Sequence, residues 1–520
     1  MTVARVTLLL AFLLVTGTPP AGAQAPQAGP GQPRAADETR GRPLTIDEAV
    51  RLALENNLGI RVARIDPQIQ DLAIAQAWGA WAPSFTSALQ NGRTDTPANS
   101  FLSGGATTRD ARVASTVAVQ QALRSGASYS IGWDGARSTT TNLFSNFSPQ
   151  LRSTLSLHVA QPLVRNFSID ASRQQLLTSQ KNRDISDLTL RQAMAVTTRD
   201  VRNAYWDLAY AIASLQVQQQ SLALAQESLR NTRSRVEIGT TPPIDIVEAE
   251  SEVATREEAV ILAEAQIEAS QDTLRALIYD PAMPDFWTLR IEPAELPAFQ
   301  ASPVDVTAAM ANALERRTDL QQARTTLGAN DISIRYLRNQ TLPDVTASFD
   351  YGLVGLGGRQ FLRGAGFPGP ITGQTSIGFG SVLGDVFTNQ FPNWTLGLNV
   401  SYPLGRSTQE ASLARARLEY TRAQAQLKNQ ELQVAAQVRG TARQVLTNQQ
   451  RVQTTRSSRE LAERRLDAEQ KKLTAGTSTS FFVFQAQRDL ALARNNEIRA
   501  VLDYNRSRVD LETIQEVPIR

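Results

Sequence analysis

The sequence predicts an α+β protein in which very long helices alternate with short, two-faced strands, and the whole arrangement occurs twice. Three observations carry this prediction: apolar residues at heptad spacing, segments that alternate with period two, and internal repetition. The 520 residues include 53 basic and 50 acidic side chains, one His and no Cys. This composition excludes disulfides, thiolate metal sites and a thiol-linked lipid anchor, and it offers no basic patch for nucleic acid.

The N-terminal segment is typical of a secretory signal. Arg5 is followed by an apolar run over residues 6–15 and by small residues at 21–23, which form a cleavage pattern. The apolar run is shorter than the ~20 residues that a spanning helix needs. We therefore expect residues 1–23 to be a signal peptide and the Pro/Gly-rich residues 24–43 to be a disordered linker.

Internal similarity predicts two copies of one structural unit. LENNLGI at residues 54–60 resembles LERRTDL at 314–320, and QPLVR at 161–165 resembles YPLGR at 402–406. Each copy is expected to contain short helices, then strands, then a helical hairpin. The expected ranges are, for the first repeat (44–300), strands within 84–164 and a hairpin over 169–279, and for the second repeat (301–520), strands within 344–404 and a hairpin over 407–513.

The strand segments carry one apolar and one polar row. A strand in a soluble sandwich has the same alternation, but these segments run about 9–11 residues, which suits a tilted membrane strand. Aromatic residues also lie near strand ends (Phe85, Trp394 and Tyr402), as in an interfacial girdle. The residues expected to face lipid are Leu155, Leu157, Val159, Phe349, Tyr351, Trp394, Leu396, Leu398 and Val400.

The helical segments predict coiled-coil rods. Ile246, Val253, Val260, Ile267 and Leu274 lie at heptad spacing, which is typical of left-handed coiled-coil packing. A rod of roughly 65 residues would be about 100 Å long, far more than the ~30 Å core of a bilayer. Because the rods are rich in Arg, Glu and Gln, we expect them to stand in water beside the membrane.

Each rod is interrupted by a break that starts with Gly-Thr. Gly239 and Gly476 can adopt positive φ and so end a helix. Pro243 is tolerated in the first turn of the returning helix, where Asp245 complements the helix dipole. We therefore expect the chain to reverse at both breaks, which would place them together at one tip.

Strands too few for a barrel of their own, long helical hairpins and a secretion signal together resemble the TolC-like outer membrane efflux family. The resemblance covers essentially all of the mature chain. It implies a homotrimeric outer-membrane β-barrel with about four strands per chain, continued by a long coiled-coil tunnel in the periplasm. It also implies tips that contact a periplasmic adaptor protein and form the gate. The tip residues so implied are Gly239, Thr240, Asp245, Gly476, Thr477, Phe482, Phe484 and Gln485.

Besides the missing lipid-anchor Cys, the second tip and the extra residues of the first repeat depart from the family pattern. Phe482 and Gln485 stand where gate carboxylates are expected, so Phe481, Phe482 and Phe484 either form an apolar plug or pack into the coiled coil. Residues 113–135 form either an extracellular loop hairpin or two further barrel strands. The Gly-rich residues 355–392 are expected to be a long extracellular loop.

The function implied is an exit duct of a tripartite efflux or secretion system. It would passively conduct substrates that an inner-membrane transporter delivers through the adaptor. With one histidine, His158, expected in the barrel lumen, no catalytic dyad or two-His metal site can form, so neither an enzyme nor a cofactor is expected. The alternatives are a structural periplasmic coiled-coil protein without a channel and a free-standing porin, which would need no rods.

Overall fold

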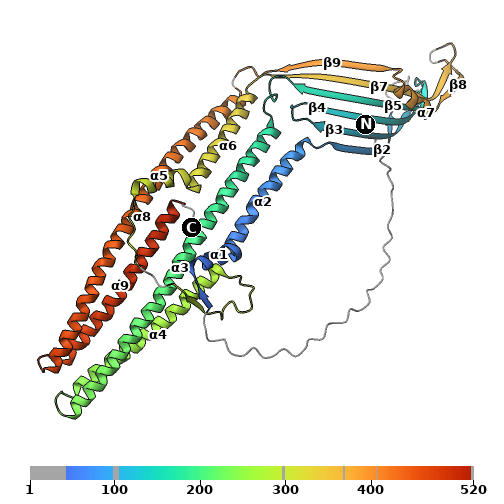
Figure 1. Cartoon of the computed structure of the whole chain (residues 1–520). Coiled ribbons are helices and arrows are strands. Elements are labelled where there is room, and N and C mark those ends of the chain that lie inside the picture. The colour runs from blue at the N-terminus through green and yellow to red at the C-terminus, as the bar shows by residue number, and fades with distance from the viewer. Residues whose placement is uncertain (1–41, 98–104, 296–298, 367–368, 406, 517–520) are drawn as a thin grey trace, which may run out of the picture.

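The computed structural model describes residues 42–97, 105–295, 299–366, 369–405 and 407–516. The expected signal peptide and nearly all of the expected linker lie outside these ranges. A β-sheet lies at one end of an elongated bundle of helices, and the two helical hairpins end side by side at the other (Figure 1). Both parts of the predicted α+β fold are therefore present in one chain.

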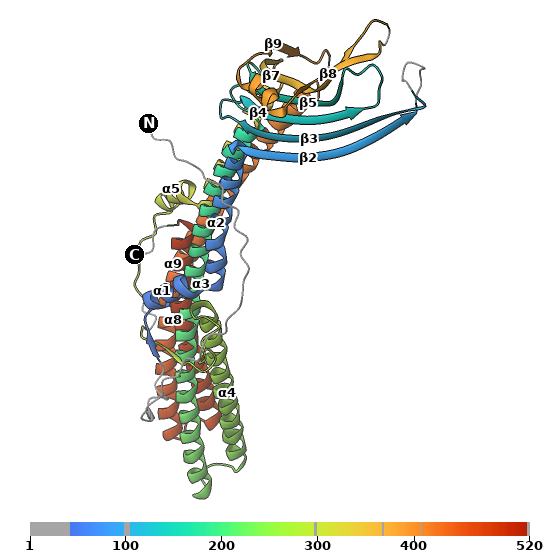
Figure 2. The ribbon, with the colours of Figure 1, turned by 90° about the vertical axis from the view of Figure 1, so that its right-hand side faces the viewer.

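The sheet contains seven described strands, all paired antiparallel. Their order is β2-β3-β4-β5-β7-β8, and β9 also pairs with β7. The strands are β2 (Ser84–Pro97), β3 (Thr107–Ala122), β4 (Ser128–Thr140), β5 (Phe147–Pro162), β7 (Asp344–Arg363), β8 (Ile371–Ile377) and β9 (Pro392–Ser401). Figure 2 shows β2 to β5 as long, curved neighbours above the helices.

The expected count of about four strands is too low for this sheet. Residues 113–135, for which a loop hairpin was one of two interpretations, lie in β3 and β4 between β2 and β5. β3 pairs with β2 along the whole of β2, and β4 pairs with β5 over Ser128–Ser138. A loop hairpin would leave these backbone groups unpaired, whereas the sheet position satisfies them on both sides.

The expected long loop over residues 355–392 is also wrong in part. β7 continues to Arg363, and β8 pairs with its last residues, Gly358–Arg363. The helix α7 (Phe379–Phe387) packs on the sheet through Val382 and Val386. Gly355 permits this close approach, because a Cβ there would clash with the Val382 carbonyl. Glycine at this position therefore serves helix–sheet packing and not loop flexibility.

The helical part repeats its dimensions. The longest helices, α3 (Ala171–Glu237) and α8 (Thr408–Thr474), both have 67 residues, and their partners α4 (Ile244–Ile278) and α9 (Ser480–Ile514) both have 35. A helix of 67 residues is about 100 Å long. The other helical elements are α1 (Ile46–Asn56), α2 (Leu58–Trp78), the 3-10 turn η1 (Gly79–Trp81), α5 (Val306–Arg316) and α6 (Thr318–Gln340).

The two repeats bury equivalent positions on their long helices, but the large aromatic residue comes from the long helix in one repeat and from the shorter helix in the other. Val201 and Leu208 on α3 have their counterparts in Val438 and Val445 on α8, and all four are fully buried. Tyr205 on α3 corresponds to the small Ala442 on α8. The space beside Ala442 is filled from α9 by Tyr504, which belongs to the same buried cluster. The duplicated unit therefore keeps its core volume while moving the large residue to the partner helix.

The hydroxyls of Tyr205 and Tyr504 each hydrogen-bond to the backbone of a segment that connects two elements outside the long helices. Tyr205 Oη donates to the Leu44 carbonyl (3.0 Å) and accepts from the Glu295 amide (3.1 Å), next to the parallel pair β1 (Arg42–Leu44) and β6 (Ile291–Pro293). Tyr504 Oη makes the same two kinds of bond to Gln300 and Ser302. Burial raises the pKa of the Tyr205 hydroxyl, so it remains a donor at neutral pH.

Tyr205→Phe is expected to lower the free energy of unfolding by about 0.5–1.5 kcal/mol, because it removes the hydroxyl's two hydrogen bonds. The Leu44 carbonyl keeps its bond from the Ala294 amide, so the loss stays below that of a fully unpaired buried group. Tyr210→Phe, on the same helix, is the control. None of the hydrogen bonds found among the described residues involves its hydroxyl, so a change within about 0.5 kcal/mol is expected. Thermal unfolding of the detergent-purified variants measures both, and equal losses would contradict the role of the Tyr205 hydroxyl.

Candidate functional site: the sheet face and the helical tips

One face of the sheet is apolar on every long strand. The register places Leu157 opposite both Ile131 of β4 and Tyr351 of β7, and Tyr351 opposite Trp394 of β9. Residues that are register partners share a face. All nine residues predicted to face lipid therefore lie on this apolar face, together with Phe85 and Leu89 of β2, Val117 and Val119 of β3, and Ile131 and Trp133 of β4.

The apolar face is uncovered over most of its height. Leu396, near the middle of its row, is 71% exposed, and Trp394, Leu398 and Val400 are exposed to a similar degree. On β7 the apolar row runs from Val345 to Leu353, which is close to the 9–11 residues of a tilted membrane strand. Beyond it, toward the end of the sheet that is distant from the helices, this face carries Arg93, Arg109, Arg137 and Arg359.

The opposite face of the sheet is polar. His158 of β5 and Asp350 of β7 are register partners on it, and His158 Nδ1 lies 2.6 Å from Asp350 Oδ1. A cavity of about 950 Å³ lies against the upper part of β2, β3 and β4, where this face contributes Gln90, Arg112 and Ser138. The sheet thus has one apolar and one polar face, as the wall of a membrane barrel does.

The sheet has two open edges. Among the residues that the structure describes, β2 pairs only with β3 and β9 only with β7, so each presents unpaired backbone groups along its outer side. Phe85 and Leu89 on β2 and Leu396 on β9 carry the apolar face up to both edges. An apolar sheet with open edges is incomplete in lipid, where every backbone donor and acceptor needs a partner.

The two tips are built by the same helix-ending motif. Gly239 has φ 78° and Gly476 has φ 72°. The amide of Thr240 donates to the Arg235 carbonyl and the amide of Thr477 to the Lys472 carbonyl, both at 2.9 Å. A glycine with positive φ followed by this bond is the Schellman ending, which satisfies carbonyls at the end of a helix.

Gly239→Ala is expected to cost about 1 kcal/mol, because a Cβ at positive φ is strained. No atom lies within 4 Å of the added Cβ, so the effect is one of backbone conformation. Gly440→Ala is the matched control: its Cβ also meets nothing, but Gly440 lies inside α8 with ordinary helical backbone. That change is expected to stabilise by about 0.5–1 kcal/mol. Thermal unfolding of both variants should give shifts of opposite sign.

The three phenylalanines of the second tip separate into two groups. Phe484 is only 3% exposed and packs into the coiled coil, whereas Phe482 is 49% exposed and lies edge-on to the exposed Phe481 at 5.7 Å. A plug containing all three rings is therefore excluded by packing. Gln485 is half-buried beside them.

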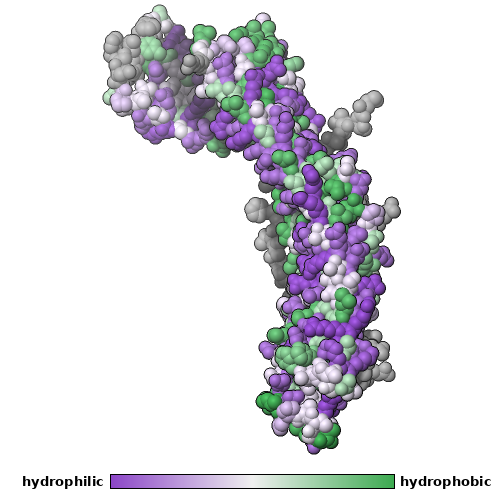
Figure 3. Space-filling view, turned by 90° about the vertical axis from the view of Figure 1, so that its left-hand side faces the viewer, coloured by the Kyte–Doolittle hydropathy of each residue, from purple (hydrophilic) through white to green (hydrophobic). Residues whose placement is uncertain are grey.

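The first tip also exposes apolar residues. Ile238, Ile244 and Val247 are exposed, while Asp245 is half-buried in the first turn of α4. Figure 3 shows hydrophobic residues at this end of the bundle. Near the second tip Glu469 accepts from Lys472 Nζ (2.7 Å) and Ser478 Oγ (2.8 Å), and these bonds lower the pKa of its carboxyl.

An ion-pair cluster above the tips joins the two hairpins, and it was not predicted from the sequence. Glu252 of α4 is 7% exposed and accepts from Arg256 Nη2 at 2.6 Å on its own helix. Arg488 Nη1 of α9 donates to the other oxygen of Glu252 at 2.9 Å. The pair at positions i and i+4 is visible in the sequence, but its partner on α9 is not, because 236 residues separate the two.

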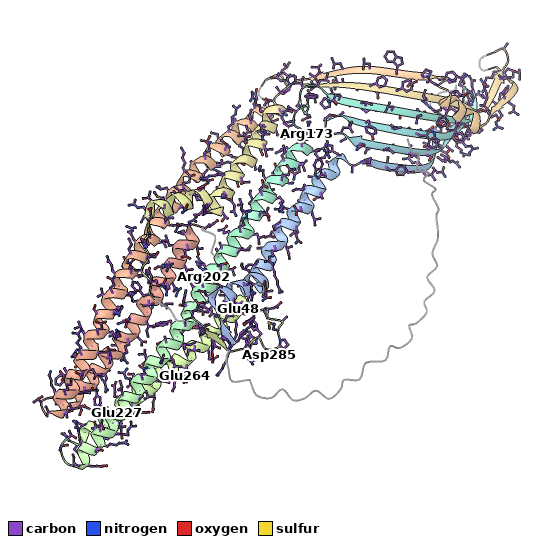
Figure 4. All side chains as sticks on the ribbon, in the orientation of Figure 1. Glu48, Arg173, Arg202, Glu227, Glu264 and Asp285 are labelled. Atoms are coloured by element: carbon purple, nitrogen blue, oxygen red, sulfur yellow. The ribbon has the colours of Figure 1, made fainter. Side chains whose placement is uncertain are left out.

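Further polar links hold α3 against α9 and the sheet. Arg202 Nη1 of α3 donates to Glu512 Oε2 of α9 (3.2 Å), and Arg173 donates to the Asn166 and Phe167 carbonyls at the junction with β5. Figure 4 shows Arg173 beside the sheet, Arg202 midway along α3 and Glu227 toward the tip. A cavity of about 280 Å³ near the tips is lined by α3, α8 and α9 and includes Glu227.

Two kinds of feature are absent from the part of the chain that the structure describes. No helix there is both long and apolar enough to cross a membrane. No group of three or more His, Asp or Glu side chains lies close enough together to hold a metal ion.

A two-faced sheet with open edges, mounted on long helical hairpins, is the architecture of a membrane channel subunit. The chain belongs to the outer membrane efflux protein family, whose model matches residues 49–278 and 309–515. The two matches correspond to the two repeats, so the expected duplication and family are confirmed. Membership places the protein in the outer membrane. Comparison with curated proteins gives no match.

Solved structures of outer-membrane channels have the same fold. The outer-membrane channel OprN is 17% identical with a TM-score of 0.64, over 90% of this chain and 89% of its own. The CmeC channel of Campylobacter jejuni is 14% identical (TM-score 0.62; 90% and 85% covered). VceC of Vibrio cholerae is 16% identical (TM-score 0.61; 90% and 95% covered). The likeness covers both the sheet and the helical hairpins.

Proposed function

We propose that three copies of this chain form a passive exit duct that crosses the outer membrane and extends through the periplasm. The observation that carries the proposal is the exposed apolar face, which continues over all long strands and ends at two open edges. Pairing β9 of one copy with β2 of the next satisfies both edges and closes a barrel. The polar face, with its hollow of about 950 Å³, then lines the lumen.

The helical hairpins extend this path into the periplasm. Their exposed apolar tips, with Ile238 and Ile244 on one and Phe481 and Phe482 on the other, suit contact with a periplasmic adaptor protein. The adaptor would connect the duct to an inner-membrane transporter, which supplies the energy. The chain acts in this arrangement as a conduit and not as an enzyme. CmeC, MtrE and OprN are each described as outer-membrane channels, which supports the assignment.

A structural coiled-coil tether is the alternative from another class. A tether has no use for an apolar face that extends over every long strand from β2 to β9. A free-standing porin would use such a face but has no use for 67-residue rods. The combination of both features favours the duct.

The test has two measurements on the intact protein. Light scattering of the detergent-purified chain is expected to give three copies per particle, and planar bilayers containing it are expected to conduct. For the adaptor, a photo-crosslinking residue at Ile244 or Phe481 is expected to capture a periplasmic partner in the native envelope, whereas one at the exposed Leu418, far from the tips on α8, is not. A monomer without conductance would refute the duct, and capture of this chain alone would refute the adaptor contact.

A further inference from the structure

The strands divide into two classes by what they are attached to. β2, β5, β7 and β9 each connect directly to a helix of the bundle: α2, α3, α6 and α8 respectively. In the described part of the chain, β3 and β4 connect to no helix, since they form a hairpin inserted between β2 and β5. The sheet therefore has two long strands more than the bundle has helices to continue them.

The inserted hairpin has the two-faced character of a barrel wall. Val117 and Val119 of β3, with Ile131 and Trp133 of β4, continue the apolar row, because they are register partners of residues on β2 and β5. On the other face Ser130 of β4 is the register partner of His158. A lid folded over the pore would have no reason to repeat this alternation in register with both neighbours.

The stagger and direction of the strands also suit closure. The register row that starts at Ser84, the first residue of β2, arrives on β7 at Asp350, well above its first residue Asp344. This stagger is the tilt that a barrel needs. The six long strands alternate in direction from β2 to β9, so β9 of one copy meets β2 of the next antiparallel.

The widths of the two parts agree only if the hairpin is counted. Next to the sheet, α2, α3, α6 and α8 lie side by side in each chain, and at 8–10 Å between axes they span about 32–40 Å. Tilted strands about 4.8 Å apart each occupy roughly 6 Å of a barrel's circumference. Six strands thus span about 36 Å and four only about 24 Å, so six match the bundle.

We propose that the duct is crossed by a barrel of eighteen long strands, six from each of three chains, in which β3 and β4 are wall strands that widen the pore. This inference rests on the trimer of the proposed function. Barrel diameter grows about linearly with strand number, so this pore is about 1.5 times as wide as one built from the four helix-linked strands. Barrels of 16–18 strands leave an open aqueous channel, which suits the passage of bulky solutes.

Neighbouring residues on β4 provide the test. The chain contains no cysteine, so Ile131→Cys and Ser130→Cys each introduce one labelling site, on opposite faces of the sheet. In liposomes, a fluorophore at position 131 is expected to be quenched by brominated acyl chains and protected from iodide. One at position 130 is expected to behave in the reverse way. Leu157→Cys and Ser156→Cys on β5 calibrate both responses.

Iodide quenching at position 131, with no quenching by brominated lipid, would overturn the inference while leaving a trimeric, conducting duct intact. Loss of the trimer in the unmodified protein would instead refute the proposed function. A second variant lacks Thr107–Thr140, so that β2 and β5 become neighbours. The largest neutral polymer that enters this barrel from the sheet side is expected to be smaller in diameter by about a third. An unchanged cut-off in an assembled trimer would also overturn the inference; if the variant does not assemble, the label at position 131 decides.

Discussion

Leu396→Arg is expected to prevent the protein from assembling in the membrane, whereas Thr395→Arg is not. Leu396 is a register partner of Phe349 on the apolar face, and Thr395 is a register partner of Asp350 on the polar face. An arginine near the middle of the lipid-facing band costs about 2–4 kcal/mol per chain, and a trimer carries this cost three times. At position 395 the guanidinium would lie in water beside a carboxylate.

The comparison uses adjacent residues of one strand, so strand propensity and expression are matched. The amount of heat-resistant trimer in the outer-membrane fraction measures assembly. Equal amounts of trimer for the two variants would show that the apolar face does not face lipid, and the barrel would then have to be abandoned.

Glu252→Ala is expected to lower the free energy of unfolding by about 3 kcal/mol and to raise the conductance of the duct. Removing a buried carboxylate leaves Arg256 and Arg488 without their common partner, and such a change is strongly destabilising. The cluster is also the ion-pair link nearest the tips among those found between the hairpins α3–α4 and α8–α9 in the described residues. We expect its loss to let the tips separate and so to widen the opening of the proposed duct at this end.

Glu250→Ala is the matched control. Glu250 lies two residues away and pairs with Arg233 on the surface, where its side chain is 50% exposed. Removing an exposed ion pair is expected to change stability by less than about 1 kcal/mol. Thermal unfolding and planar-bilayer recordings measure both variants. If Glu252→Ala is destabilised but its conductance stays at the level of Glu250→Ala, the cluster stabilises the bundle without controlling the tips.

Much of the helical part could be predicted because its signals are local. Of the heptad residues on α4, Leu274 is fully buried and the other four are half-buried, so the spacing identified the side of the helix that packs. Gly239 and Gly476 mark the ends of helices because few other residues adopt positive φ. Spacing along one helix and conformation at one residue need no knowledge of the rest of the chain.

The candidate site could be predicted only in part. Alternation along β5 and β9 identifies two-faced strands, but it does not say which strands are neighbours. Phe484 and Phe482 have the same local sequence environment, yet one is buried and the other exposed. Arg488 finds Glu252 only because α4 and α9 come together near the tips. Strand pairing, burial and ion pairing all depend on which residues lie in contact, and those contacts depend on the packing of segments that are distant in the sequence.

The amino-acid sequence by itself determined the duplication, the length of the rods, the two chain reversals and the family, because local patterns indicate each of them. Only the tertiary structure decided that the sheet has six long strands and that a buried carboxylate joins the hairpins. The physical reason is that periodicity is a property of one segment and its backbone geometry. Strand neighbours and ion pairs are settled by the competition among all segments for hydrogen-bond partners and burial.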